Sequence, residues 1–228
     1  MRLAAVFSGG KDSTFSIYKM IMGGNEITHL VTVAPKNSES YMFHVPDIKW
    51  TKYQSESMGI PQIFREVSGE KEKEVEELKQ ILEPLKSEID GIVSGAIASN
   101  YQKSRIDNMC RELGIKSIAP IWGIDQETHL RNLINARFKI IITGTFADGL
   151  DENWLGRELD ATAINELVEL NKKYKINISG EGGEYESFVL DCPLFKKELA
   201  VERAEKHWNE KEHNGYFEIK KLSSTQKI

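Results

Sequence analysis

The first half of the chain alternates short apolar runs with amphipathic segments of helical length, and this rhythm limits the fold more than any other feature. Four runs rich in apolar or β-branched residues predict strands at 3–7, 27–33, 61–67 and 89–94. Helical spacing that stops at a glycine or proline predicts helices at 15–22, 70–82 and 99–113. Such alternation is typical of α/β proteins, so we expect a Rossmann-like parallel sheet with helices on both faces. Ligands of such sheets bind at the carboxyl ends of the strands.

The rhythm changes after Ile124. The second half predicts a helix, a strand, a second helix, a polar glycine-rich segment and a terminal β-hairpin, at 126–136, 138–145, 160–174, 180–186 and 196–222. We therefore expect two domains without a linker between them, an N-terminal domain of residues 1–124 and a smaller C-terminal α+β domain of residues 125–228.

Charge and composition exclude several classes of function. The 228 residues carry 30 Lys and Arg against 35 Asp and Glu, and a net charge of −5 gives no general attraction to nucleic acid. No apolar run is long enough to span a bilayer, and the N-terminus lacks the apolar core of a signal peptide. Two cysteines without a CxxC pair indicate a reduced, cytoplasmic protein without a zinc site. The sequence leaves the oligomeric state open, a homodimer included.

One polar motif follows the first predicted strand and opens the first predicted helix. It consists of Ser8, Gly9, Gly10, Lys11, Asp12 and Ser13. Glycines let backbone N–H groups approach an anion, and the positive end of the helix points to the same place. Lys11 adds a cation, so the motif predicts a pyrophosphate site, although it lacks the first glycine of a Walker A loop. The simpler alternative is a turn in which Asp12 or Ser13 caps the helix, but capping does not account for the glycines and the lysine.

This motif resembles the signature of the PP-loop ATP pyrophosphatases, which cleave ATP between the α and β phosphates. Further segments are similar to the diphthine–ammonia ligase family within that group: 41–44, 94–102 with Arg105, 120–122, 125–126, 149–151 and 180–187. The resemblance covers nearly the whole chain, and the Glu-Gly-Gly-Glu-Tyr-Glu stretch at 181–186 is its most specific part.

The resemblance implies a reaction and its co-substrates. Enzymes of this family amidate diphthine, a modified histidine of elongation factor 2, to diphthamide with ATP and ammonium. The carboxylate is adenylated, which releases pyrophosphate. Ammonia then opens the acyl adenylate, which releases AMP. Lys11 and Mg²⁺ would hold the pyrophosphate, with Asp12 as the metal ligand; helix capping is nearly as good an interpretation of Asp12.

The glycine-rich segment supplies candidate groups for cations. Its members are Glu181, Gly182, Gly183, Glu184, Tyr185 and Glu186. Carboxylates and an aromatic face suit both ammonium and the trimethylammonium group of diphthine, and one glutamate can deprotonate ammonium. We expect this segment to face the glycine motif. The alternative, for each glutamate alone, is an acidic surface turn.

Four further residues are candidates for binding substrate or nucleotide. Tyr101, Gln102 and Arg105 begin a helix after a strand end, where Arg105 can clamp a phosphate or carboxylate. His44 lies in a loop where adenine can stack. Three of them have a structural alternative: Gln102 completes a capping box with Ser99, Arg105 forms an exposed ion pair, and His44 is a surface residue.

Two other functions stay open. A PP-loop enzyme that modifies tRNA would usually have paired cysteines and a basic surface, and this chain has neither. A regulator that holds ATP without cleaving it would form no AMP, but it has no need of the pyrophosphate clamp that Lys11 and Asp12 suggest.

Overall fold

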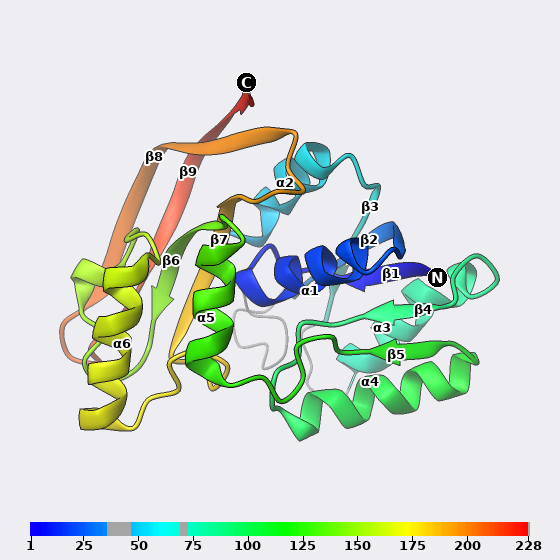
Figure 1. Cartoon of the computed structure of the whole chain (residues 1–228), viewed down its shortest axis with the longest axis horizontal. Coiled ribbons are helices and arrows are strands. Elements are labelled where there is room, and N and C mark those ends of the chain that lie inside the picture. Colours follow the sequence, from blue (N-terminus) through cyan, green and yellow to red (C-terminus); the bar gives the residue numbers. More distant parts are fainter. Residues whose placement is uncertain (36–46, 69–72, 228) are drawn as a thin grey trace. The chain divides into compact units, whose positions relative to one another are not determined.

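The computed structural model describes residues 1–35, 47–68 and 73–227, which form two compact units (Figure 1). The first unit contains residues 1–8 and 12–123, and the second contains residues 9–11 and the chain from residue 124 onward. The tripeptide Gly9–Lys11, in the middle of the glycine motif, therefore groups with the second unit.

The first unit contains a five-stranded sheet in which all neighbouring strands are parallel. Its elements are β1 (Arg2–Val6), α1 (Lys11–Met22), β2 (Glu26–Pro35), η1 (Ile48–Trp50), α2 (Thr51–Met58), β3 (Gln62–Val67), α3 (Glu74–Leu82), η2 (Glu83–Leu85), β4 (Gly91–Val93), α4 (Asn100–Leu113) and β5 (Lys116–Ile118). The strand order is β3-β2-β1-β4-β5, which confirms the predicted Rossmann-like class. This order reverses between β1 and β4, and ligands of such sheets bind at that point.

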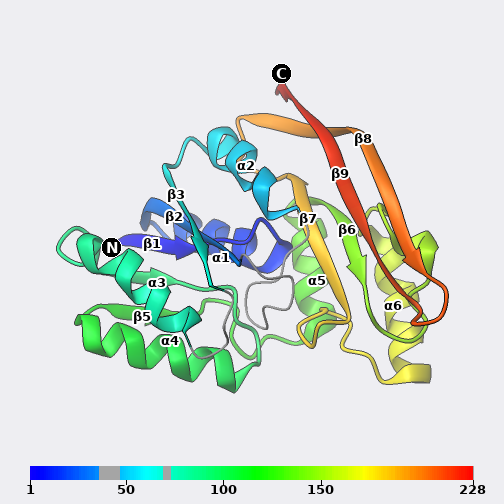
Figure 2. The same cartoon turned by 180° about the vertical axis from the view of Figure 1, so that it is seen from behind.

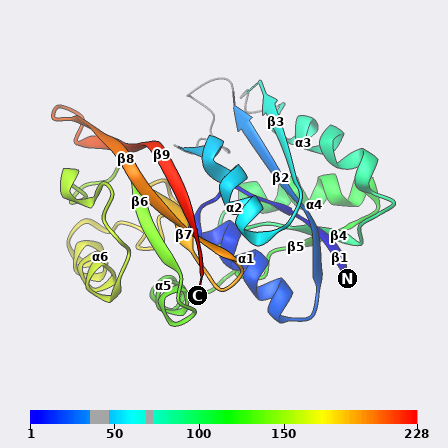
Figure 3. The ribbon, with the colours of Figure 1, turned by 90° about the horizontal axis from the view of Figure 1, so that it is seen from above.

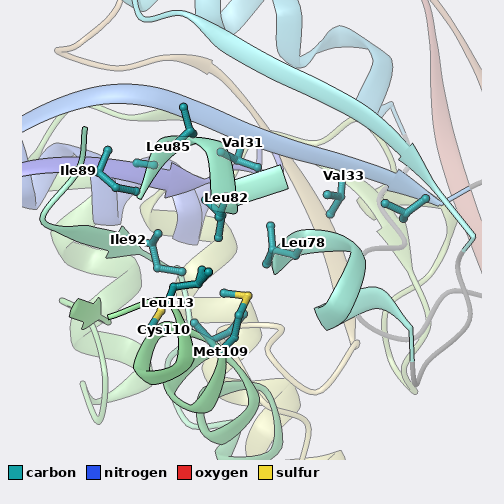
Figure 4. Close-up of a cluster of buried hydrophobic side chains, with 13 residues drawn as sticks. Val31, Val33, Leu78, Leu82, Leu85, Ile89, Ile92, Met109, Cys110 and Leu113 are labelled. Carbon is teal, nitrogen blue, oxygen red and sulfur yellow. The ribbon is translucent and has the colours of Figure 1, made fainter. Parts of the chain in front are cut away.

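Helices cover both faces of this sheet, as the alternating pattern predicts. Figure 3 shows α1 and α2 on one face and α3 and α4 on the other. On the latter face, Leu78 and Leu82 of α3 and Met109 of α4 pack against Val31 and Val33 of β2 (Figure 4). Burial of a leucine side chain contributes about 1.5–3 kcal/mol, so this cluster holds α3 and α4 on the sheet.

The second unit contains an antiparallel sheet of order β7-β6-β9-β8. Its elements are α5 (Gln126–Asn135), β6 (Lys139–Thr145), η3 (Glu152–Trp154), α6 (Ala161–Tyr174), β7 (Tyr185–Asp191), β8 (Lys197–Asn209) and β9 (Asn214–Gln226). In Figures 2 and 3, α5 and α6 lie on one side of this sheet. Leu130 and Leu133 of α5 and Ile164 and Leu167 of α6 are fully buried.

Both helices of the second unit begin as their sequences predict. The side chains of Asp125 and Asp160 accept hydrogen bonds from the N–H groups of Thr128 (2.9 Å) and Ala163 (2.7 Å). The Thr128 amide lowers the pKa of Asp125 because it stabilises the charged carboxylate. These caps fix the N-terminal boundaries of α5 and α6.

The predicted terminal hairpin is confirmed and is longer than expected. β8 and β9 pair over their whole length, from Lys197 opposite Gln226 to Asn209 opposite Asn214. The Asn-Gly pair at 214–215 starts β9 and does not form the turn, which lies at 210–213. At the opposite end of the sheet, β7 pairs only with β6 among the described strands and is therefore an edge strand.

The two cysteines are buried, as expected of small apolar residues. Both Cys110 and Cys192 are 1% exposed. Burial raises the pKa of Cys110 to about 11 and that of Cys192 to about 12, so neither thiol forms a nucleophilic thiolate at neutral pH. Within the described part of the chain, no helix has the length and apolar character needed to cross a membrane.

Candidate functional site

The glycine motif lies between the carboxyl end of β1 and the start of α1. Gly9 has a φ of 79°, a left-handed conformation that glycine adopts without strain. Ser13 closes the turn: its Oγ accepts a hydrogen bond from the Ser8 N–H (3.3 Å) and lies 3.1 Å from the Ser8 Oγ. The positive end of the α1 dipole lies at this turn, so this end of α1 is suited to binding an anion.

The loop after β4 approaches the same helix end within the first unit. A Cβ on Gly95 would lie 2.7 Å from the Ser13 nitrogen and 2.9 Å from the Asp12 carbonyl carbon. Only a glycine permits this distance, because real Cβ atoms do not come so close to backbone. The loops after β1 and β4 therefore meet where the strand order reverses.

Lys11 is almost completely buried, with 3% of its surface exposed, and it contacts β7 within the second unit. Its Nζ lies 4.9 Å from the centroid of the Tyr185 ring, and its backbone N–H donates to the Ser187 Oγ at 3.3 Å. The Gly9 carbonyl accepts a hydrogen bond from the Val189 N–H at 3.1 Å. The structure thus brings the predicted lysine and the predicted tyrosine together.

The glycine-rich segment, whose last two residues begin β7, folds into a turn. Several of its polar groups form hydrogen bonds that stabilise this turn. The Gly183 N–H donates to the Gly180 carbonyl (3.1 Å), and Glu184 Oε1 accepts from the Asn177 N–H (3.0 Å). Among the described residues, the buried Glu184 Oε2 has no hydrogen-bond partner. The Tyr185 hydroxyl donates to the Ile178 carbonyl at 2.9 Å.

The three glutamates of the segment are therefore not equivalent. The Glu184 carboxylate is directed into the turn, since a Cβ on Gly182 would lie 2.6 Å from its Oε1. Glu181 and Glu186 are half-buried, and a Cβ on Gly144 would lie 3.4 Å from the Glu186 Cβ. These contacts favour a structural role for Glu184, and contact of Glu181 or Glu186 with a cation stays a prediction.

The candidates on α4 form a local pair. Arg105 hydrogen-bonds with the Tyr101 hydroxyl, and its guanidinium carbon lies 4.7 Å from the centroid of the Tyr101 ring. This is the (i, i+4) contact expected on one face of a helix. His44 and the side chain of Gln102 lie outside the described residues.

Asp12 fits the predicted Mg²⁺ site in its chemistry. Mg²⁺ is usually bound by one or two carboxylates together with phosphates, and Asp12 is a half-buried carboxylate in the first turn of α1. Among the described residues, one cluster has three potential metal ligands: Glu205, His207 and Glu218 of the β8–β9 hairpin. Lys220 Nζ lies 3.2 Å from Glu205 and 2.7 Å from Glu218, so an ammonium group already supplies positive charge there.

Sequence reasoning missed Ser187 and Val189, which contact the glycine motif. Two signals existed for Ser187: it ends the family-like segment 180–187, and the alternation of side chains in a strand places residues 185 and 187 on the same face. Nothing local links Ser187 to a lysine 176 positions earlier.

Comparisons with known proteins cover nearly the whole chain. The model of the diphthamide synthase N-terminal domain matches residues 1–117, and that of the diphthamide synthase C-terminal domain matches residues 125–225. Diphthine–ammonia ligase from Homo sapiens is 36% identical over 226 residues, which cover 90% of this chain and 84% of the relative. The Danio rerio diphthine–ammonia ligase is also 36% identical, over 90% of this chain and 88% of the relative.

The match to one solved structure has 18% sequence identity and covers 85% of this chain and 98% of the chain in that structure. It is described as a predicted subunit of tRNA methyltransferase from Methanocaldococcus jannaschii. The TM-score between the two structures is 0.45.

Proposed function

Because the chain belongs to the diphthamide synthase family, whose curated relatives are diphthine–ammonia ligases, we propose that it amidates diphthine on elongation factor 2. ATP and ammonium are the co-substrates, and AMP and pyrophosphate are the products. The observation that carries this proposal is the buried Lys11 in a glycine loop that opens α1 at the carboxyl end of β1.

The first step activates a poor acyl donor. A carboxylate oxygen of diphthine attacks the α phosphorus of ATP, the bond from that phosphorus to the bridging oxygen breaks, and pyrophosphate leaves with the bond electrons. An acyl adenylate remains. Lys11 and the amides at the start of α1 stabilise the charge that develops on the pyrophosphate, which is the usual task of oriented donors in phosphoryl chemistry.

The second step forms the amide. Glu181 or Glu186 accepts a proton from ammonium, and the nitrogen of ammonia attacks the acyl carbon. The bond from that carbon to the AMP oxygen breaks, AMP leaves, and the nitrogen loses a further proton. Carboxylates suit this site because they attract ammonium and can take its proton.

Mg²⁺ fits the same scheme through Asp12, the carboxylate in the first turn of α1. When bound, the ion supplies positive charge that neutralises the phosphates of ATP. Asp12 would hold the ion, and the Lys11 ammonium would bind phosphate oxygens of ATP.

The test incubates the full chain with ATP, Mg²⁺, ammonium and elongation factor 2 that carries diphthine. AMP, pyrophosphate and the mass of the modified peptide are measured in the same reaction. We expect AMP and pyrophosphate in equal amounts and the small mass loss of an acid that becomes an amide. Omission of the factor or of ammonium provides the controls.

The outcomes separate this proposal from its alternatives. ATP that binds without cleavage, with an unchanged peptide, would contradict the ligase and favour a nucleotide-binding regulator. AMP that forms only when tRNA replaces the factor would favour a tRNA-modifying enzyme.

A further inference from the structure

The edge strand β7 contacts the glycine motif at three alternate positions. The Val189 N–H donates to the Gly9 carbonyl at 3.1 Å, and the Ser187 Oγ accepts from the Lys11 N–H at 3.3 Å. The Tyr185 ring lies 4.9 Å from the Lys11 Nζ. All five residues belong to the second unit, so one strand holds both the backbone and the side chain of Lys11.

From this arrangement we propose that Ser187 and Tyr185 are positioning residues, which fix the backbone and the side chain of Lys11 so that its ammonium is placed for the nucleotide. The inference rests on the proposed function, in which Lys11 binds the phosphates of ATP. A lysine side chain has many rotamers, and ordering it before the ligand arrives reduces the entropy lost on binding. A held lysine therefore binds ATP more tightly than a mobile one.

Ser187 is suited to this task because its hydroxyl is both an acceptor and a donor. It is 5% exposed, so its geometry is fixed by the surrounding strand. The hydroxyl accepts from the Lys11 amide, which is one of the first N–H groups of α1 and has no acceptor within the helix. Removal of the Ser187 hydroxyl would release the backbone of Lys11, the residue on which phosphate binding is proposed to depend.

Tyr185 is held on both its polar and its apolar sides. Its hydroxyl donates to the Ile178 carbonyl at 2.9 Å, and a Cβ on Gly180 would lie 2.9 Å from its Cε1. The ring is 2% exposed and interacts with the Lys11 ammonium by a cation–π attraction. This burial favours a role toward Lys11 over contact with the trimethylammonium group of the substrate.

The first test measures the Kd of the full chain for ATP by calorimetry in Ser187→Ala and Ser187→Thr. We expect Ser187→Ala to bind ATP about three- to tenfold more weakly, as loss of one hydrogen bond predicts. Ser187→Thr keeps the hydroxyl and should restore the affinity to within about twofold. Ser16→Ala is the matched control, because Ser16 is a buried serine of α1 whose hydroxyl has no hydrogen-bond partner in the described part of the chain.

The second test combines Tyr185→Leu with Lys11→Met. Tyr185→Leu should weaken ATP binding by about three- to tenfold in the native background, because it removes the cation–π contact that holds the Lys11 ammonium. In the Lys11→Met background it should cause no further loss, because coupled residues are not additive. Tyr185→Phe keeps the ring and should bind ATP within about twofold of the native chain, which provides a variant with little risk to folding.

The outcomes distinguish this inference from the proposed function. Native chain that does not bind ATP would overturn both. If Lys11→Met binds ATP weakly but Ser187→Ala binds it as tightly as the native chain or more tightly, this inference alone is wrong. A Tyr185→Leu effect that persists in full in the Lys11→Met background would equally exclude action through the lysine.

Discussion

Two glycine-rich polar segments, 8–13 and 180–186, look alike in sequence but use their polar groups in different ways. The first joins a parallel strand to a helix, so the positive end of the α1 dipole lies within it. The second precedes an edge strand and folds on itself, with Glu184 bonded to the Asn177 amide and the Tyr185 hydroxyl to the Ile178 carbonyl.

The difference shows that glycine and charge alone do not define a binding site. In the first segment, glycine brings donors to a helix end that can accept an anion. In the second, Gly180 and Gly183 have φ values of 75° and 89°, and these left-handed residues shape the turn that places Tyr185. The first segment is therefore expected to govern catalysis directly, and the second to act partly through the structure that it supports.

The largest expected effect comes from the first segment. Lys11→Met should lower the rate of AMP formation by about 10²- to 10³-fold, because it removes the cation proposed to stabilise the leaving pyrophosphate. The rate is measured at saturating ATP with diphthine-bearing elongation factor 2. Lys19→Met, in the same helix, is the control: Lys19 is exposed and donates to the Pro120 carbonyl, and its loss should change the rate by no more than about twofold. Equal losses of rate in the two variants would contradict a special role of Lys11.

In the second segment, Gly180→Ala should lower the free energy of unfolding more than Gly183→Ala does. Both substitutions place alanine at a positive φ, which costs about 1–2 kcal/mol. At Gly180 the added Cβ also meets the Tyr185 ring at 2.9 Å, whereas nothing lies within 4 Å at Gly183. We expect Gly180→Ala to lower the free energy of unfolding by about 1–3 kcal/mol more than Gly183→Ala does. Urea denaturation measures this difference, and equal losses would show that the turn accommodates the methyl group.

The Glu184 carboxylate allows the structural role of the second segment to be tested at a single side chain. Glu184→Ala should lower the free energy of unfolding by about 1–3 kcal/mol, because the Asn177 amide loses its acceptor. Glu184→Gln keeps an acceptor oxygen and should recover most of that loss. Unfolding in urea and the KM for ammonium are measured for both variants. If Glu184→Gln is stable but has a strongly raised KM for ammonium, Glu184 contacts the cation and its role is not mainly structural.

Local signals were sufficient for much of this molecule. Apolar runs predicted four of the five parallel strands, all but β5, and helical spacing predicted helices that begin next to the capping residues Asp125 and Asp160, because periodicity depends on neighbouring residues. The position of the glycine motif followed in the same way, since a strand and a helix flank it in the chain.

Long-range contacts could not be predicted from these signals. Ser187 and Lys11 are 176 residues apart, and neither residue type indicates the other. The direction of the Glu184 carboxylate depends on the backbone at Asn177, which composition does not encode. Likewise Gly95 lies in a segment that the sequence singled out, but its contact with the start of α1 follows from the meeting of two loops.

The smallest expected effect concerns the ion pair of Arg157 and Glu166, which lies outside both segments. Arg157 binds Glu166 with two hydrogen bonds of 2.6 Å, which lower the pKa of Glu166 because they stabilise its charged form. The Glu166 side chain is 47% exposed, so solvent screens the pair, and Glu166→Gln should cost only about 0.5–1 kcal/mol of unfolding free energy. Since the pKa is lower in the folded state, this contribution is present above the pKa of the unfolded chain and is lost as the pH falls through the folded pKa. Native and variant chains should therefore differ in urea denaturation at neutral pH and converge in acid. A difference that persists unchanged in acid would mean that packing, and not the charge of Glu166, is what the substitution removes.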